Sequence, residues 1–281
     1  MNFRIKIKLF MVLILAIMTA GSALAANENI YAVSTDNANI YEINITTGVV
    51  TVATIGQFNE SVSLAYDGTY TYYWNSDGPS FRGLTKWNPL TNSHTSIKGS
   101  EISEKNACVD SSGNLWVLDR TNSTVDGAAL HDATNYLYQI NKITGVRTVS
   151  YTLPDVGGYA AGDIAWGPGG KLYISTNNTF WTYDTVSNYI WNPADPTNIA
   201  KKGGVYHAGL VWVDDKLYGS KTVSGTGVLF ELNPTDFSEI AQIATMPTSI
   251  TIGDLSNAVP EPATIFLLGL SSIALLKKHR K

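Results

Sequence analysis

Between residues 27 and 256 the chain consists of short segments in which apolar and polar residues alternate, separated by turns rich in Asn, Asp, Thr and Gly. Alternation with a period of two residues is typical of half-buried β-strands. An amphipathic helix of normal length would show a period of 3.6 residues, and no segment of this region has it. The pattern therefore predicts an all-β fold.

The predicted strands recur in a fixed order with a period of roughly 45 residues, which is in the range of propeller blades. An aromatic-centred strand B is followed by an alternating strand C, a polar turn and an outer strand D that is rich in β-branched residues. The B strands are 29–33, 70–74, 114–118, 171–175 and 216–220, and the C strands are 40–44, 84–88, 137–141, 180–184 and 229–233. The D strands are 49–55, 95–97, 146–153, 189–191 and 239–244, and innermost A strands precede B at 62–66, 107–109, 162–166 and 209–213.

The first B strand has no A strand before it. Residues 250–255 resemble residues 160–164, since both contain a Gly-Asp pair, so they predict the missing A strand at the other end of the domain. Such closure between the two ends would remove exposed sheet edges. We therefore expect a five-bladed β-propeller in residues 26–258, with a regular β-sandwich as the alternative.

A common turn follows each C strand. It begins with Asn or Asp, has Thr or Ser three residues later, and continues with Gly or Asn, as a type I turn that closes with a left-handed residue requires. The five turns begin at Asn44, Asn88, Asn141, Asp184 and Asn233. The last copy departs from the pattern, because Asp236 and Phe237 occupy its fourth and fifth positions.

The N-terminus has the three parts of a secretory signal peptide. Arg4, Lys6 and Lys8 precede an apolar run, and Ala23-Leu24-Ala25 offers a small-residue cleavage site. We therefore expect residues 1–25 to be removed on export, with a retained anchor helix as the alternative. In an oxidising compartment the single cysteine, Cys108, cannot form an internal disulfide, and its apolar strand predicts a buried, inert thiol.

Charge and motifs limit the classes of function. Charged residues make up 15% of the chain and the formal net charge is −4, so no basic surface for nucleic acid is expected. The sequence has no Walker loop, no GxSxG elbow and no dinucleotide fingerprint. His94, His131 and His207 show no metal-ligand spacing, so we interpret them as solvated loop residues. Asp214-Asp215 is interpreted as a polar turn.

Polar residues recur at the start of the A strands. The equivalent positions are Ser63, Asn106, Asp163, Gly209 and Asp254. Because innermost strands line the channel of a propeller, this ring could hold a divalent cation such as calcium or a small polar ligand. With a cation, the channel could serve a metal-dependent hydrolase or lyase. The alternative is that these side chains satisfy backbone groups and solvent.

Aromatic residues fall into two groups. Those at strand centres, Tyr31, Trp116, Tyr173 and Trp181, are expected to pack between blades. Trp191 and Tyr206 lie in or beside the long link from 192 to 207, where they could form an exposed platform for sugar rings. A second over-length connection covers residues 120–135.

The last residues of the chain form three blocks in a fixed order. Pro260-Glu261-Pro262 precedes an apolar run at 263–276, and a basic end follows at 277–281. Residues 259–281 thus resemble the PEP-CTERM protein-sorting tail. The apolar run is short for a membrane span of about 20 residues, which favours a transient anchor over a permanent one. By the positive-inside preference its basic end would remain cytoplasmic.

The resemblance implies that the chain is a substrate of an exosortase in a Gram-negative bacterium that makes exopolysaccharide. It would be held briefly in the inner membrane, cleaved near Pro-Glu-Pro, and delivered to the cell surface or the extracellular matrix. The propeller also resembles NHL-like and lactonase-like propellers in architecture, without a diagnostic active-site motif. These expectations together favour a non-catalytic module that binds exopolysaccharide or a surface protein, with a spacer that binds no ligand as another possibility.

Overall fold

The computed structural model describes residues 28–37, 39–55, 60–76, 82–97, 106–119, 124–125, 128–129, 135–153, 163–175, 180–184 and 207–258. The predicted leader (1–25) and sorting tail (259–281) lie outside these residues. So do His131, Trp191 and Tyr206. Within the described residues no helix is long and apolar enough to cross a membrane.

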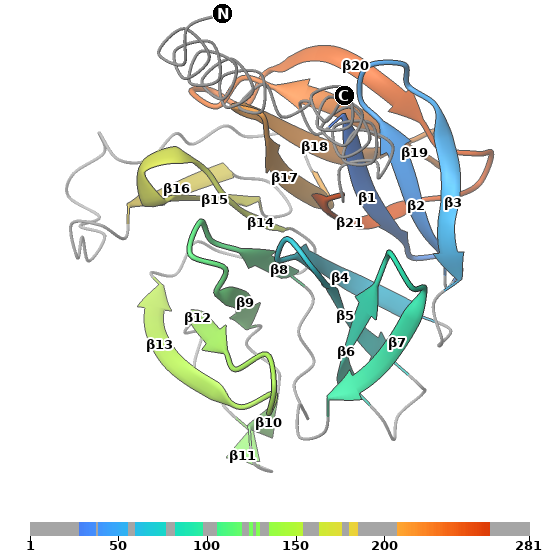
Figure 1. The fold of residues 1–281 in the computed structure, drawn as a ribbon. Helices are drawn as coiled ribbons and strands as arrows, with labels where there is room; N and C mark the ends of the chain where they lie inside the picture. The colour runs from blue at the N-terminus through green and yellow to red at the C-terminus, as the bar shows by residue number, and fades with distance from the viewer. Residues whose placement is uncertain are drawn as a thin grey trace, which may run out of the picture. The chain divides into compact units, whose positions relative to one another are not determined.

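Antiparallel sheets surround a central axis, as in a β-propeller (Figure 1). The closing blade consists of β21 (Ile252–Asn257), β1 (Asn29–Ser34), β2 (Asn39–Asn44) and β3 (Val50–Ile55). The second blade consists of β4 (Glu60–Tyr66), β5 (Thr71–Ser76), β6 (Arg82–Asn88) and β7 (Ser93–Ile97). The third consists of β8 (Asn106–Val109), β9 (Leu115–Asp119), β12 (Asn135–Ile140) and β13 (Arg147–Leu153). The last consists of β17 (Gly209–Val213), β18 (Lys216–Val223), β19 (Thr226–Leu232) and β20 (Glu239–Thr245).

Between the third and the last blade lies a three-stranded sheet of β14 (Ile164–Trp166), β15 (Lys171–Ser175) and β16 (Phe180–Asp184). Its predicted outer strand, 189–191, falls outside the described residues. Four complete blades are therefore shown where the repeat predicted five. The β10 (Thr124–Val125) and β11 (Ala128–Ala129) hairpin belongs to the connection between β9 and β12.

The innermost strands form a closed circle. β4 contacts β8 and β21, β14 contacts β8 and β17, and β17 contacts β21. β21 pairs antiparallel with β1, from Ile30 opposite Asn257 to Ser34 opposite Ile252. The last strand of the domain therefore completes the sheet of the first, as the Gly-Asp similarity predicted, and this arrangement excludes the β-sandwich.

Three of the four strand-centre aromatic residues pack between neighbouring sheets, as predicted. The ring of Tyr31 lies 5.2 Å from that of Trp87, Trp116 lies 5.8 Å from Trp166, and Tyr173 stacks on Trp212 at 5.1 Å. The fourth, Trp181, lies in β16, but its side-chain surroundings are not described. Buried clusters that cross from sheet to sheet thus hold the ring together, as expected for a domain whose single cysteine is free and buried.

The turns after the C strands have the predicted conformation. Asn44 accepts hydrogen bonds at Oδ1 from the backbone N–H groups of Thr46 and Thr47, at 3.1 and 2.8 Å. The fifth residue of each described turn is left-handed: Gly48, Asn92, Gly145 and Phe237 have φ values of 72°, 51°, 73° and 57°. Phe237 therefore adopts the same conformation in spite of its atypical side chain.

Phe237 shows why this turn tolerates a bulky left-handed residue. Its side chain is fully buried and meets the ring of Tyr173 edge to face, with the centroids 6.1 Å apart. A left-handed backbone costs a non-glycine residue roughly 1–2 kcal/mol, whereas deleting a buried Phe side chain costs about 3–5 kcal/mol. The packing between the last blade and the three-stranded sheet thus outweighs the backbone strain.

We expect Phe237→Ala to lower the free energy of unfolding by about 3–5 kcal/mol, because it keeps the strained backbone and removes the buried ring. Ser224→Ala is the matched control, since Ser224 is also left-handed (φ 50°) but exposed. Its effect should stay within about 0.5 kcal/mol. Urea unfolding followed by tryptophan fluorescence measures both. Equal effects for the two variants would show that the buried ring contributes nothing.

Candidate functional site: the start of the inner strands

The polar ring predicted from the sequence exists, and its side chains are buried. Ser63, Asp163 and Asp254 have no exposed surface, and Asn106 is 1% exposed. These positions follow the connections that enter the inner strands, so each lies at or near the start of its strand. Their burial means that any polar atom here must find its partners inside the protein.

Asp254 joins the closing blade to the second blade. Its Oδ2 accepts the backbone N–H of Leu64 at 2.7 Å, and its Oδ1 accepts the N–H of Leu255 at 2.6 Å. Leu64 begins the apolar part of β4, the neighbouring inner strand. One carboxyl group therefore links two adjacent inner strands at the point where the ring closes.

Asp163 makes the same connection between the three-stranded sheet and the last blade. Its Oδ2 accepts the N–H of Leu210 at 2.5 Å and its Oδ1 accepts the N–H of Ile164 at 2.7 Å. Ser175 supports it from the second strand, because its Oγ accepts the N–H of Asp163 and donates to the carbonyl of His207, both at 2.8 Å. The two aspartates thus act as blade-to-blade links.

Gly209 occupies the ring position between the two aspartates. A Cβ atom there would lie 2.7 Å from Cγ of Leu255 and 2.9 Å from Oγ of Ser220. The absence of a side chain at Gly209 lets β17 and β21 approach, and Asp163 and Asp254 hydrogen-bond to each other beside them. Burial raises the pKa of Asp163 to about 7. Burial, and then the charge of Asp163, raise the pKa of Asp254 well above its usual range.

These contacts favour a structural role for the ring over a cation site. All four carboxylate oxygens accept backbone N–H groups. Over the part of the chain that the structure describes, no three His, Cys, Asp or Glu side chains are placed to hold a metal ion. The geometry therefore gives no support to the calcium interpretation or to the metal-dependent hydrolase built on it.

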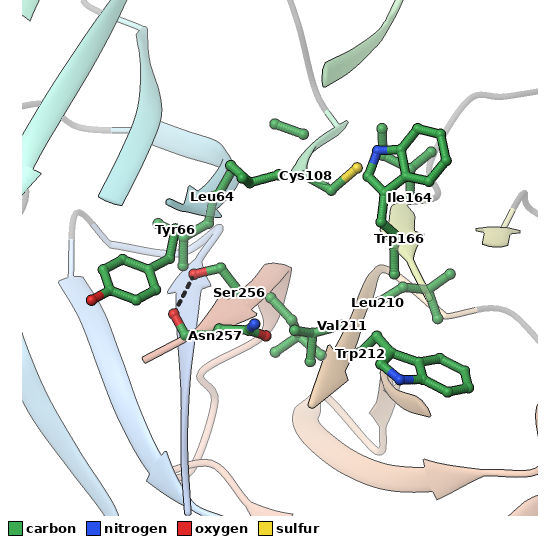
Figure 2. Close-up of a pocket in the computed structure, with 15 residues that line it drawn as sticks. Leu64, Tyr66, Cys108, Ile164, Trp166, Leu210, Val211, Trp212, Ser256 and Asn257 are labelled. Atoms are coloured by element: carbon green, nitrogen blue, oxygen red, sulfur yellow. Dashed lines mark hydrogen bonds between the residues drawn. The ribbon is translucent and has the colours of Figure 1, made fainter. Parts of the chain in front are cut away.

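A small cavity of about 50 Å³ lies on the axis (Figure 2). Three consecutive residues of each inner strand line it, starting with Leu64, Ala107, Ile164, Leu210 and Leu255, and none of the five ring positions does. A water molecule needs about 10–15 Å³ by this measure, so the cavity has room for a few waters. The two aspartates accept backbone N–H groups of neighbouring strands instead, in line with the alternative that these side chains satisfy backbone groups.

The indoles at the periphery of the cavity are packing residues. Figure 2 shows Trp166 and Trp212 directed away from its centre. Trp166 packs at a tilt against Trp116, and Trp212 stacks on Tyr173, in each case on the preceding sheet. Cys108 also borders the cavity. Burial, and then the charges of Asp163 and Asp254, raise the pKa of its thiol well above the usual range, so it remains protonated, as predicted for an inert residue.

The interpretation of the histidines as solvated loop residues is wrong for His207. This side chain is fully buried, with Nε2 3.8 Å from Oε1 of Glu239, and burial lowers its pKa to about 4. An isolated histidine before a strand carries no sequence signal of burial. The imidazole fits here because residue 219 on β18 is a glycine: a Cβ atom at Gly219 would lie 2.8 Å from Nδ1 of His207.

His94 is half-buried rather than free in solvent. Its Nδ1 lies 2.7 Å from the hydroxyl oxygen of Tyr73, and its ring stacks on Trp87 at 6.2 Å. Burial lowers its pKa. The interpretation of Asp214-Asp215 as a polar turn is confirmed, since both residues are exposed in the turn between β17 and β18.

Comparison with known proteins identifies the tail and the fold. Residues 258–281 match the PEP-CTERM protein-sorting motif, as the three ordered blocks predicted. A chain of the nidogen/laminin complex aligns with a TM-score of 0.54 and 9% identity, covering 81% of this chain and 97% of that one. A protein of unknown function from Bacteroides caccae aligns with a TM-score of 0.49 and 12% identity, again covering 81% of this chain and 97% of that one. No curated protein matches the sequence. At this identity the structural likeness is one of fold alone.

Proposed function

We propose that the chain is an exported binding module, with a propeller that carries the ligand site and a PEP-CTERM tail that directs sorting. The matched motif at residues 258–281 implies processing by an exosortase, and therefore export and a transient stay in the membrane. The leader at 1–25 and delivery to the cell surface or matrix complete this proposal. The ligand class that we propose is exopolysaccharide or a surface protein of the same matrix.

The position of the two long connections is the observation that carries the binding proposal. One joins β9, which ends at Asp119, to β12, which begins at Asn135. The other runs from Asp184, where β16 ends, to His207, which precedes β17. Because neighbouring strands of a blade are antiparallel, β9 ends, and β12 and β17 begin, at the end at which the inner strands start. Both long connections thus enter their next strand, β12 or β17, at this end of the propeller.

The body of the propeller supports a non-catalytic role. Its aspartate oxygens are engaged by backbone groups, its axial cavity has room for only a few waters, and the raised pKa of its thiol keeps the thiol protonated. Binding loops on a rigid scaffold are a common arrangement in β-proteins. Trp191 and Tyr206, at the borders of the second long connection, are the residues that we propose to stack on sugar rings.

We expect the purified domain to bind a glycan from the matrix of its own cells, and Trp191→Ala to weaken that binding by at least about tenfold. Tyr70→Ala is the control, since Tyr70 lies in the turn between β4 and β5, at the opposite end. A glycan array, followed by calorimetry with the best ligand, gives both affinities. Binding that survives Trp191→Ala would remove the platform, and no glycan binding at all would favour the spacer.

A further inference from the structure

The chain leaves the propeller at the end where the inner strands finish, which we call the exit face. Ala258 donates its backbone N–H to the carbonyl of Asn29 at 3.2 Å, and Nδ2 of Asn44 donates to Oδ1 of Asn29 at 3.0 Å. Asn44 begins the turn after β2, so this turn lies at the exit face. In the second and third blades the strand pairing places the turns after β6 and β12 at the same end.

Exposed apolar side chains gather in these turns. Among the described residues eight large apolar side chains are exposed, and half of them lie in the turns of three neighbouring blades. They are Val49 in the closing blade (56% exposed), Leu90 in the second (68%), and Ile143 and Val146 in the third (86% and 57%). Leu90 and Ile143 are each the third residue of their turn, and Val49 and Val146 are each the sixth. Single exposed apolar residues are ordinary, but a group of them at one end of a domain indicates a surface that a partner covers.

Charge divides the exit face into two sides. In the third blade the apolar tips lie between two cations, since Lys142 precedes Ile143 and Arg147 follows Val146. Lys142 also pairs with Asp67 of the second blade. In the last blade the corresponding turn exposes Asp236, and the turn before β18 exposes residues 214–215, both aspartates. An anionic surface would therefore approach the closing, second and third blades and be repelled by the last.

The sequence after Ala258 identifies this surface. The apolar run of the sorting tail begins at residue 263, five residues later. Five extended residues span at most about 17 Å, which equals the radius of gyration of roughly 17 Å expected for a compact domain of this size. While the tail is in the membrane, the exit face is thus the end of the propeller that is held nearest to the bilayer.

We propose that the exit face rests on an anionic lipid bilayer, with Leu90, Ile143 and Val146 inserted at the boundary between headgroups and acyl chains. The proposal rests on the membrane stay proposed above and adds the orientation of the domain. Because both long connections enter their next strands at the opposite end, the proposed ligand site then points away from the bilayer.

The test uses the full chain in vesicles of equal parts phosphatidylcholine and phosphatidylglycerol. A fluorophore is attached to Ile143→Cys, and brominated acyl chains act as the quencher. Cys108 is buried, so the label reacts with the introduced thiol. Ile55→Cys is the matched control, because Ile55 is 69% exposed but ends β3 at the opposite end. We expect the label at residue 143 to lose most of its emission and the label at residue 55 to keep it.

The possible outcomes separate the orientation from the function on which it rests. A chain that binds the vesicles with no quenching at residue 143, or with equal quenching at both residues, overturns the orientation alone. A chain that does not bind the vesicles overturns the membrane stay, and the orientation with it. Equal quenching in phosphatidylcholine alone overturns the choice of an anionic surface. A label at residue 143 that responds only to the density of protein in the vesicles would assign the turns to a second copy of the chain instead.

Discussion

A chain that ends at Thr251, and so lacks β21, is expected to lose its cooperative unfolding transition, whereas a chain that ends at Ala258 is expected to keep it. In the complete domain, β21 supplies all the strand-pairing partners of β1 on the inner side of β1. It also supplies Ile252 and Leu255, which are 3% and 2% exposed in a cluster shared by the closing and last blades. Each such side chain contributes about 1.5–3 kcal/mol by burial.

The free energy lost with β21 should exceed the total stability of a domain of this kind. Total stabilities are about 5–15 kcal/mol, and removing β21 also leaves the buried N–H of Leu64 without its Asp254 acceptor. Calorimetry and near-ultraviolet circular dichroism of the two truncated chains make the comparison. The longer chain is the control for removal of the tail. A cooperative transition at an unchanged temperature in the shorter chain would show that the ring does not depend on closure.

Local patterns in the sequence predicted most strands because each strand depends mainly on its own residues. Period-two alternation predicted β2, β6 and β19, and the turns that begin with Asn predicted the left-handed residues Gly48, Asn92 and Gly145. Closure was also predictable, because the Gly-Asp pair of β21 repeats that of the three-stranded sheet. In each case the physical cause lies within a few neighbouring residues.

The parts that the sequence did not predict depend on contacts between sheets. Asp163 and Asp254 were recognised as equivalent, but the partner of each carboxylate is the backbone of another inner strand, which carries no side-chain signal. The burial of His207 depends on Gly219, and that of Phe237 on the ring of Tyr173, both on other strands. Such three-dimensional complementarity between distant residues has no local pattern.

The aspartate pair also leads to an expected pH dependence with a defined sign. Both carboxyl groups have a pKa raised by burial, so the folded state retains protons that the unfolded state has lost. Their contribution to stability is fully present below the unfolded pKa of about 4. It is lost as the pH rises through the folded pKa, which is about 7 for Asp163 and is also raised for Asp254.

The buried histidines act in the opposite direction over a different range. The pKa of His207 is lowered to about 4, and that of His94 is also lowered. Their contribution to stability is therefore complete above the unfolded pKa of 6.5 and is lost as the pH falls. The Cys108 thiol, with its raised pKa, affects stability only above the unfolded pKa of a thiol, about 8.5. Between pH 6.5 and 8.5 the aspartate pair should therefore dominate.

In this window we expect the free energy of unfolding to fall by up to about 1.4 kcal/mol per pH unit for each proton that the folded pair still holds. Urea unfolding at steps of half a pH unit measures the slope. Asp163→Asn and Asp254→Asn should flatten it, because the amide does not titrate, at the cost of one backbone acceptor each. A flat profile for the unaltered protein would show that the folded pair retains no extra proton in this range. A falling profile that both variants retain would assign the titration to another group, leaving these aspartates as permanently charged links between blades.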